Sequence, residues 1–162
     1  TLPTSIIGTF TITPMIVDVL DIPVIAAGGI GDARGVASAF ELGAEGVFLG
    51  SRFIPTVENP AAQSVKQKIV DSSAADLLLY RTLPAYYRSL PTPFAEKLVA
   101  MDNQGASREE IAKVGGGSSV IRIGMLEGIG EGGIITVGTG ITPIKKIQTV
   151  QEVVDELATG IR

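Results

Sequence analysis

Two glycine-marked strand ends, one helix apart, constrain the fold of this chain more than any other feature. Residues 22–53 contain an apolar run at 23–27 that ends in Gly28-Gly29, and a second run at 46–49 that ends in Gly50-Ser51. Short apolar runs that stop at turn residues predict buried strands. Between them, Asp32 suits an N-cap and Gly43 suits the left-handed residue that closes a helix. The segment therefore predicts a βαβ unit with two parallel strands.

Parallel strands place their carboxyl ends at the same edge of a sheet, so Gly28, Gly29, Gly50 and Ser51 are expected to lie side by side. A phosphate needs several backbone N–H groups that converge without side chains in the way. Two such ends separated by a single helix therefore predict a phosphate site. Ordinary turns are the alternative, because parallel strands often end in glycine.

Composition restricts the class of protein. The 162 residues are 45% hydrophobic but only 5% aromatic, which favours one aliphatic α/β core. No apolar run could span a bilayer and no signal peptide is recognisable, so a cytoplasmic protein is expected. The net charge of −4 does not favour nucleic-acid binding. Histidine and cysteine are absent and the acidic residues have no metal-ligand spacing, so no metal site is expected.

The remaining patterns divide the chain into three segments. Residues 71–93 hold three prolines and all three tyrosines, which predicts irregular or short-helical structure. The change of character near residue 54 is the one plausible domain boundary, with a smaller region from 54 to 133 and a return to the first part over 134–162. Helices are further expected at residues 9–20, 60–69, 93–101, 108–114 and 150–158. The expected N-caps of the last four are Asn59, Thr92, Ser107 and Thr149.

Five side chains near these segments have two readings. Arg34 and Arg52 follow the strand ends and could meet a phosphate, although an ion pair is the simpler reading. Tyr80, Tyr86 and Tyr87 could line a flavin or substrate pocket, or could anchor a domain interface.

Three segments carry a resemblance to a known family: residues 9–21, residues 22–53 with the motifs AAGGI and GSRF, and residues 124–157. Together they resemble the C-terminal half of the nitronate monooxygenases, formerly called 2-nitropropane dioxygenases, and their relatives the flavin-dependent enoyl-acyl-carrier-protein reductases II. The resemblance implies an α/β fold, the C-terminal part of a TIM-type (β/α)8 barrel. The runs at 23–27 and 46–49 would be its seventh and eighth strands, followed by a smaller, helical inserted domain.

The resemblance also implies an FMN-dependent oxidoreductase that acts on a small-molecule substrate. Its catalytic histidine would lie upstream of Thr1, so no catalytic residue is expected in this chain, which alone would be inactive. The N-terminal half of the same barrel would be its partner, and a homodimer remains open. The residues implied to bind the cofactor, most of them through backbone amides at the phosphate, are Ala27, Gly28, Gly29, Gly50 and Ser51.

Three functions follow from these observations. The first is oxidation of alkyl nitronates with molecular oxygen, and the second is NAD(P)H-dependent reduction of an enoyl thioester through FMN. The third is a non-catalytic module that binds a phosphate-bearing ligand.

Overall fold

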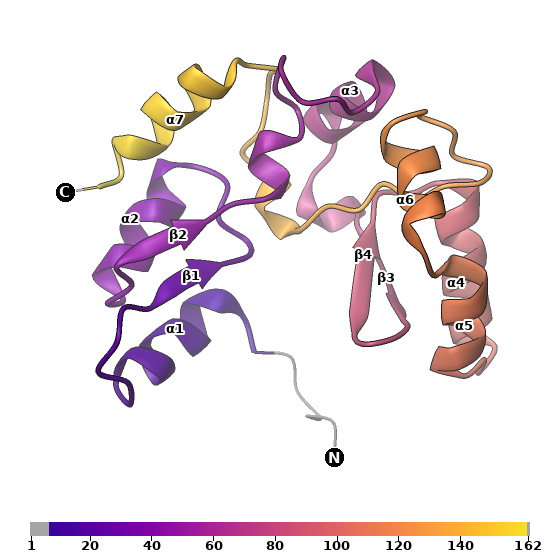
Figure 1. The fold of residues 1–162 in the computed structure, drawn as a ribbon, viewed down its shortest axis with the longest axis horizontal. Coiled ribbons are helices and arrows are strands. Elements are labelled where there is room, and N and C mark those ends of the chain that lie inside the picture. Colours follow the sequence, from indigo (N-terminus) through magenta and orange to yellow (C-terminus); the bar gives the residue numbers. More distant parts are fainter. Residues whose placement is uncertain (1–6, 162) are drawn as a thin grey trace.

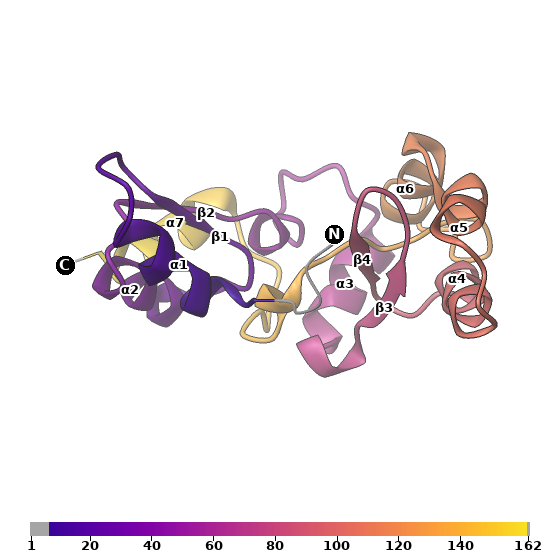
Figure 2. The ribbon, with the colours of Figure 1, turned by 90° about the horizontal axis from the view of Figure 1, so that it is seen from below.

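The computed structural model describes residues 7–161, which form an arch of two parts joined at its top (Figure 1). Along the described chain the helices are α1 (Thr9–Val17), α2 (Ala33–Glu41), α3 (Gln63–Asp71), α4 (Pro93–Asn103), α5 (Arg108–Gly115), α6 (Ser118–Met125) and α7 (Val150–Ala158), and the strands are β1 (Ile25–Ala27), β2 (Gly46–Phe48), β3 (Leu78–Arg81) and β4 (Tyr86–Ser89). One part contains α1, β1, α2, β2 and α7, and the other contains β3, β4 and α3 to α6. Seen from below, the two parts lie next to each other along the long axis (Figure 2).

The first part confirms the βαβ unit expected from the two apolar runs. Strands β1 and β2 pair in parallel, with Ala27 opposite Phe48, so both chains reach the same edge of the sheet together. Helix α2 connects them, and the Asp32 side chain accepts a hydrogen bond from the Gly35 N–H at 3.0 Å. Gly43 closes this connection at φ +89°, a left-handed conformation that only glycine adopts without cost.

The two faces of the β1–β2 pair differ in what covers them. Ala26 and Val47 point toward α2 and α7 and join a core whose buried members are Ala26, Ile30, Val36, Ala39, Ala44, Val153 and Leu157. On the opposite face Ile25 is 64% exposed and Phe48 is 69% exposed. Parallel sheets are normally buried on both faces. Within residues 7–161 this apolar face has no cover, and the described chain contributes one parallel strand pair to the expected barrel, without closure.

The second part corrects the interpretation of residues 71–93 as irregular or short-helical. Strands β3 and β4 form an antiparallel hairpin with Tyr80 opposite Tyr87. Tyr80 is buried with Leu98, Ile111 and other side chains of the neighbouring helices, so packing against α4 and α5 selects the extended conformation. The smaller region is therefore mixed, because a two-stranded sheet accompanies its helices.

Two further differences concern helices. Helix α6 occupies residues 118–125, for which no element was predicted, and α3 begins at Gln63, three residues after the predicted start. Asn59 does not cap α3, because its side-chain oxygen accepts from the Ala61 N–H within a turn. The caps expected at Thr92, Ser107 and Thr149 are all present.

A third cluster joins the two parts. The segment before η3 (Thr139–Ile141), a short 3-10 helix, runs extended, and Ile135 pairs with Leu90 just beyond β4. Val137, Ile141 and Ile144 continue into a core with Val65 and Ile69 of α3. This extended segment therefore ties the hairpin to the first part of the molecule.

Candidate functional site

The two strand ends lie side by side, as the sequence predicts. After β1 the backbone turns at Gly28 and Gly29, with φ +92° and +76°. After β2 it passes through Gly50 into η1 (Ser51–Phe53), a single 3-10 turn. Three glycines and a serine thus follow two adjacent parallel strands at one edge.

Hydrogen bonds from distant segments hold both ends in place. The Ser51 hydroxyl accepts from the Gly138 N–H at 2.8 Å, across 87 positions of sequence. The Thr9 hydroxyl, at the start of α1, donates to the Ala27 carbonyl at 2.9 Å. Thr139 stands over the turn, since a methyl group added at Gly29 would lie 3.2 Å from its hydroxyl. Sequence reasoning missed Thr9 and Gly138, because only the tertiary fold brings them here.

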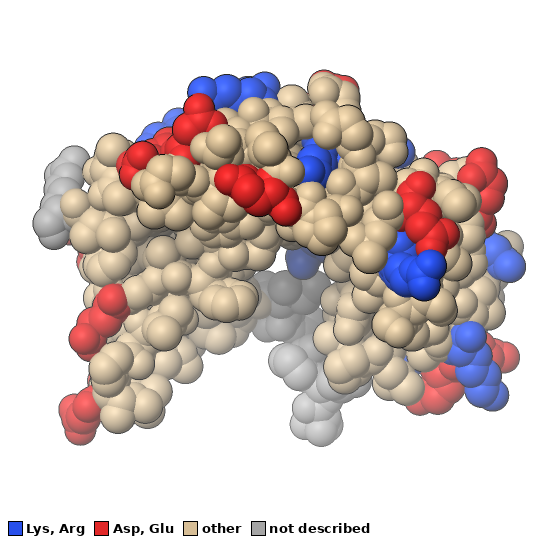
Figure 3. All heavy atoms as spheres, turned by 45° about the horizontal axis from the view of Figure 1, so that its top comes forward, with Lys and Arg blue, Asp and Glu red and all other residues tan. Residues whose placement is uncertain are grey.

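A cleft of about 520 Å³ opens at Gly28 and Gly29 after β1, whereas Ala27, Gly50 and Ser51 are not among the residues that line it. Its walls come from the start of α1, the turn after β1, strand β4 and the segment at Gly138. The described residues that line it are Ile7, Gly8, Thr9, Phe10, Thr11, Gly28, Gly29, Arg88, Gly138 and Thr139. Figure 3 shows the recess between the two parts of the arch, whose visible walls are mostly uncharged.

A second, more open cleft of about 800 Å³ lies beside the N-terminus of α2. Arg34 and Asp32 line it and form an exposed ion pair at 2.6 Å. Partial burial by itself would raise the pKa of Asp32, but the Gly35 N–H and the Arg34 guanidinium outweigh it and lower that pKa below its ordinary value. The charge of Arg34 is thus matched by its neighbour, as the simpler reading of this residue predicts.

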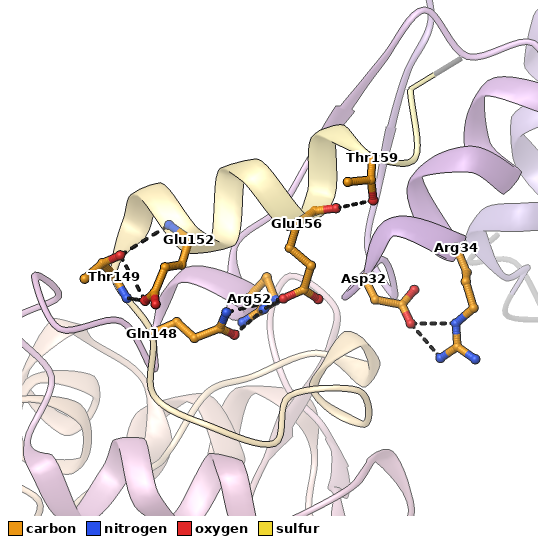
Figure 4. Close-up of polar contacts among 8 residues, drawn as sticks. All are labelled: Asp32, Arg34, Arg52, Gln148, Thr149, Glu152, Glu156 and Thr159. Carbon is orange, nitrogen blue, oxygen red and sulfur yellow. Dashed lines mark hydrogen bonds and ion pairs between the residues drawn. The ribbon is translucent and has the colours of Figure 1, made fainter.

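Arg52 also forms an ion pair instead of facing the cleft (Figure 4). Its side chain is only 2% exposed, and its Nη2 donates to Gln148 at 2.9 Å and to Glu156 of α7 at 3.0 Å. The Nε and Nη1 atoms have no partner among the described residues. Arg52 therefore links the turn after β2 to the last helix and positions Ser51, its neighbour in sequence.

The tyrosines belong to the second part of the molecule and do not line the cleft. Tyr80 is buried, and this burial, together with nearby Tyr87, raises the pKa of its phenol. Tyr86 lies under the Arg108 guanidinium, 5.3 Å from the ring centre. Tyr80 and Tyr87 pack within the core of the second part, so they neither line the cleft nor anchor an interface with the first part.

Residues 7–161 provide neither a metal-binding cluster nor a membrane-spanning helix. No group of three acidic residues is close enough to hold a metal ion in this range. None of the helices described is both long and apolar enough to cross a membrane.

This chain is similar to one protein family and to several solved structures. A family model described as nitronate monooxygenase matches residues 2–160. A probable nitronate monooxygenase of Staphylococcus aureus (strain Newman) is 44% identical over 73 residues, which are 45% of this chain and 21% of the relative.

Among solved structures, FabK from Thermotoga maritima is 33% identical and superposes with a TM-score of 0.85 over 96% of this chain and 49% of FabK. The enoyl reductase domain of MlnA from Bacillus amyloliquefaciens is 25% identical, with a TM-score of 0.51 over 72% of this chain and 31% of that chain. The chain thus spans about half the length of FabK and a smaller share of the other two relatives.

Proposed function

Because this chain belongs to the nitronate monooxygenase family, we propose that the protein is an FMN-dependent oxidoreductase that oxidises alkyl nitronates with molecular oxygen. The two adjacent strand ends hold the phosphate of FMN on the backbone amides of Gly28, Gly29, Gly50 and Ser51, with Ala27 beside the cofactor. The proposal rests on the family and on the geometry of these ends.

The observation that carries the cofactor site is the glycine at position 50. Its φ of −100° suits any residue, and a methyl group added there would meet nothing within 4 Å. The described fold therefore gives no internal reason for glycine at this position. A phosphate that approaches the backbone closely would supply one. Gly28 and Gly29 differ, because their positive φ values already require glycine.

The residues of this chain would bind and orient the cofactor, and FMN supplies the electron-accepting chemistry when it is bound. Amide N–H groups at the strand ends would donate hydrogen bonds to a dianionic phosphate, and glycine has no side chain to keep the phosphate away from the backbone. Ser51 is already hydrogen-bonded to the Gly138 N–H, which fixes its hydroxyl and the turn that carries it. The 162 residues contain no histidine, so none of them supplies an imidazole as the acid–base group.

The exposed apolar face of β1 and β2 supports the same proposal. Ile25 and Phe48 point to the side where the interior of a (β/α)8 barrel would lie. The N-terminal half of the barrel covers this face in the complete protein. Residues 1–53 and 134–162 then belong to the barrel, and residues 54–133 form the smaller inserted domain.

A Gly50→Ala variant tests the cofactor site. The new methyl group is expected to leave the melting temperature unchanged, since it meets no protein atom, and to weaken FMN binding at least tenfold. Gly132→Ala is the matched control: Gly132 lies away from the cleft and has no positive φ, and its added methyl group would meet only Ile123, at an ordinary 3.5 Å. Equal FMN affinity in Gly50→Ala and the unmodified protein would contradict the site.

A second candidate function is reduction of an enoyl thioester by NAD(P)H through FMN, favoured by the likeness to the enoyl reductase domain of MlnA. Anaerobic mixing of the FMN-loaded protein with NAD(P)H or with a nitronate separates the two. Rapid bleaching of the flavin by the nitronate alone supports the monooxygenase, and rapid bleaching by NAD(P)H supports the reductase. If neither reagent bleaches a bound flavin, the result favours the third candidate, a module that binds a phosphate-bearing ligand without redox function.

A further inference from the structure

Arg88 reaches the cleft from the second part of the molecule. Side chains alternate along a strand, and its neighbour Tyr87 packs toward the helices α4 and α5. Arg88 therefore lies on the other face of the hairpin, and it lines the cleft together with Gly28 and Gly29. Figure 1 shows β4 on the side of the second part that faces β1 across the arch.

The position of β4 relative to the strand ends is fixed by hydrogen bonds. The Ser89 hydroxyl accepts from the Ile135 N–H at 3.0 Å, and the Leu90 N–H donates to the Ile135 carbonyl at 2.9 Å. Three residues later the Gly138 N–H donates to Ser51. A short extended segment thus connects the strand that carries Arg88 directly to the turn after β2.

The charge balance of the cleft is one-sided. Arg88 is the single charged residue among the described residues that line it, and the other polar side chains there are three threonines. Four arginines, at positions 34, 52, 81 and 122, pair with carboxylates, whereas residues 7–161 offer Arg88 no carboxylate within 4 Å. A half-buried guanidinium that faces hydroxyls and glycine backbone is suited to an oxyanion.

We propose that Arg88 binds the anionic group of the ligand that occupies this cleft. This inference rests on the proposed function, which offers two sources of the same chemistry: the phosphate of FMN and the nitronate, whose two oxygens match the guanidinium fork as a carboxylate does. In either case Arg88 is a binding residue supplied by the second part of the molecule, and it places that part in direct contact with the ligand.

The test compares Arg88→Met and Arg88→Lys with Arg122→Met in the complete protein that the proposed function assumes, with its N-terminal barrel half. Arg122 is an exposed residue of α6 that does not line the cleft, so its variant removes the same charge elsewhere. Three measurements are made on each variant: the Kd for FMN and for riboflavin, the Kd of the flavin-free protein for inorganic phosphate, and KM and kcat with ethylnitronate. Thermal melting checks that all variants fold.

If Arg88 holds the cofactor phosphate, Arg88→Met weakens FMN and inorganic phosphate about ten- to a hundredfold and leaves riboflavin unchanged. If it holds the nitronate, the FMN affinity is kept and KM rises by a similar factor while kcat changes little. Arg88→Lys keeps the positive charge but loses the parallel N–H donors of the guanidinium, so its values should lie between those of Arg88→Met and the unmodified protein. Equal values for Arg88→Met and Arg122→Met in every measurement overturn the proposal. Arg88-dependent phosphate binding in a protein that binds no FMN would keep the anion site and reject the proposed function.

Discussion

The pairing of Arg52 with Glu156 predicts an unequal effect of removing either partner. Arg52 is 2% exposed and two of its three nitrogens have no partner, whereas the Glu156 side chain is 42% exposed. Glu156→Ala leaves a buried cation whose one remaining partner is Gln148. Arg52→Met removes the buried cation with its unpartnered N–H groups, and the carboxylate that remains can be solvated.

The magnitudes follow from these exposures. Breaking a fully buried pair costs about 3–5 kcal/mol, and water can enter where the half-exposed carboxylate stood, so Glu156→Ala should cost about 2–3 kcal/mol. Arg52→Met should cost about 1 kcal/mol or less, because replacing a buried charge by an apolar side chain of similar length is often close to neutral. Asp155→Ala, an exposed charge on the same helix, should stay within about 0.5 kcal/mol of the unmodified protein.

Urea unfolding of the flavin-free protein, followed by circular dichroism at pH 7, measures all three variants. With a slope of about 2 kcal/mol per molar urea, the midpoints of Glu156→Ala and Arg52→Met should differ by about 1 M. The double variant should resemble Arg52→Met, because the carboxylate has no buried cation left to neutralise. A larger loss for Arg52→Met than for Glu156→Ala would refute this reasoning.

Two further predictions concern α7 and the uncovered face. The Thr149 N–H and hydroxyl donate to Glu152 at 2.7 and 3.0 Å and lower its pKa. A carboxyl whose pKa is lower in the folded than in the unfolded state stabilises the fold above its unfolded pKa, and this stability is lost as the pH falls. The urea midpoint should therefore fall as the pH drops from 5 to 3, and it should fall less steeply in Glu152→Gln. Parallel profiles of midpoint against pH for the two proteins would count against the cap. Phe48→Ala should cost about 3–5 kcal/mol in thermal or urea unfolding if the barrel covers it, whereas a change within 0.5 kcal/mol would show that Phe48 stays exposed.

Local chemistry explains which elements the sequence could predict. Asp32, Thr92 and Thr149 cap helices by accepting hydrogen bonds from amides three residues further on, so their patterns can be recognised without the fold. The paired apolar runs before Gly28 and Gly50 are equally local, and their parallel register follows from the single helix between them.

The rest of the fold depends on contacts that the sequence does not encode nearby. The hairpin at residues 78–89 is extended because Tyr80 packs against α4 and α5, a contact that its proline and three tyrosines do not signal. Ser51 accepts from Gly138 across 87 positions, and Arg88 reaches the cleft only because β4 is tied to Ile135. The motif GSRF marks Ser51, but nothing in the sequence places Gly138 or Arg88 beside the strand ends, so these two became visible as parts of one site only in the structure.

The central claim is that the two strand ends bind the phosphate of FMN, and comparing FMN with riboflavin in the purified protein tests it most directly. The flavins differ only in that phosphate. Several charge-assisted hydrogen bonds, each contributing about 1.5–3 kcal/mol, predict that FMN binds at least a hundredfold more tightly than riboflavin. Equal affinity of the protein for the two flavins would contradict the account.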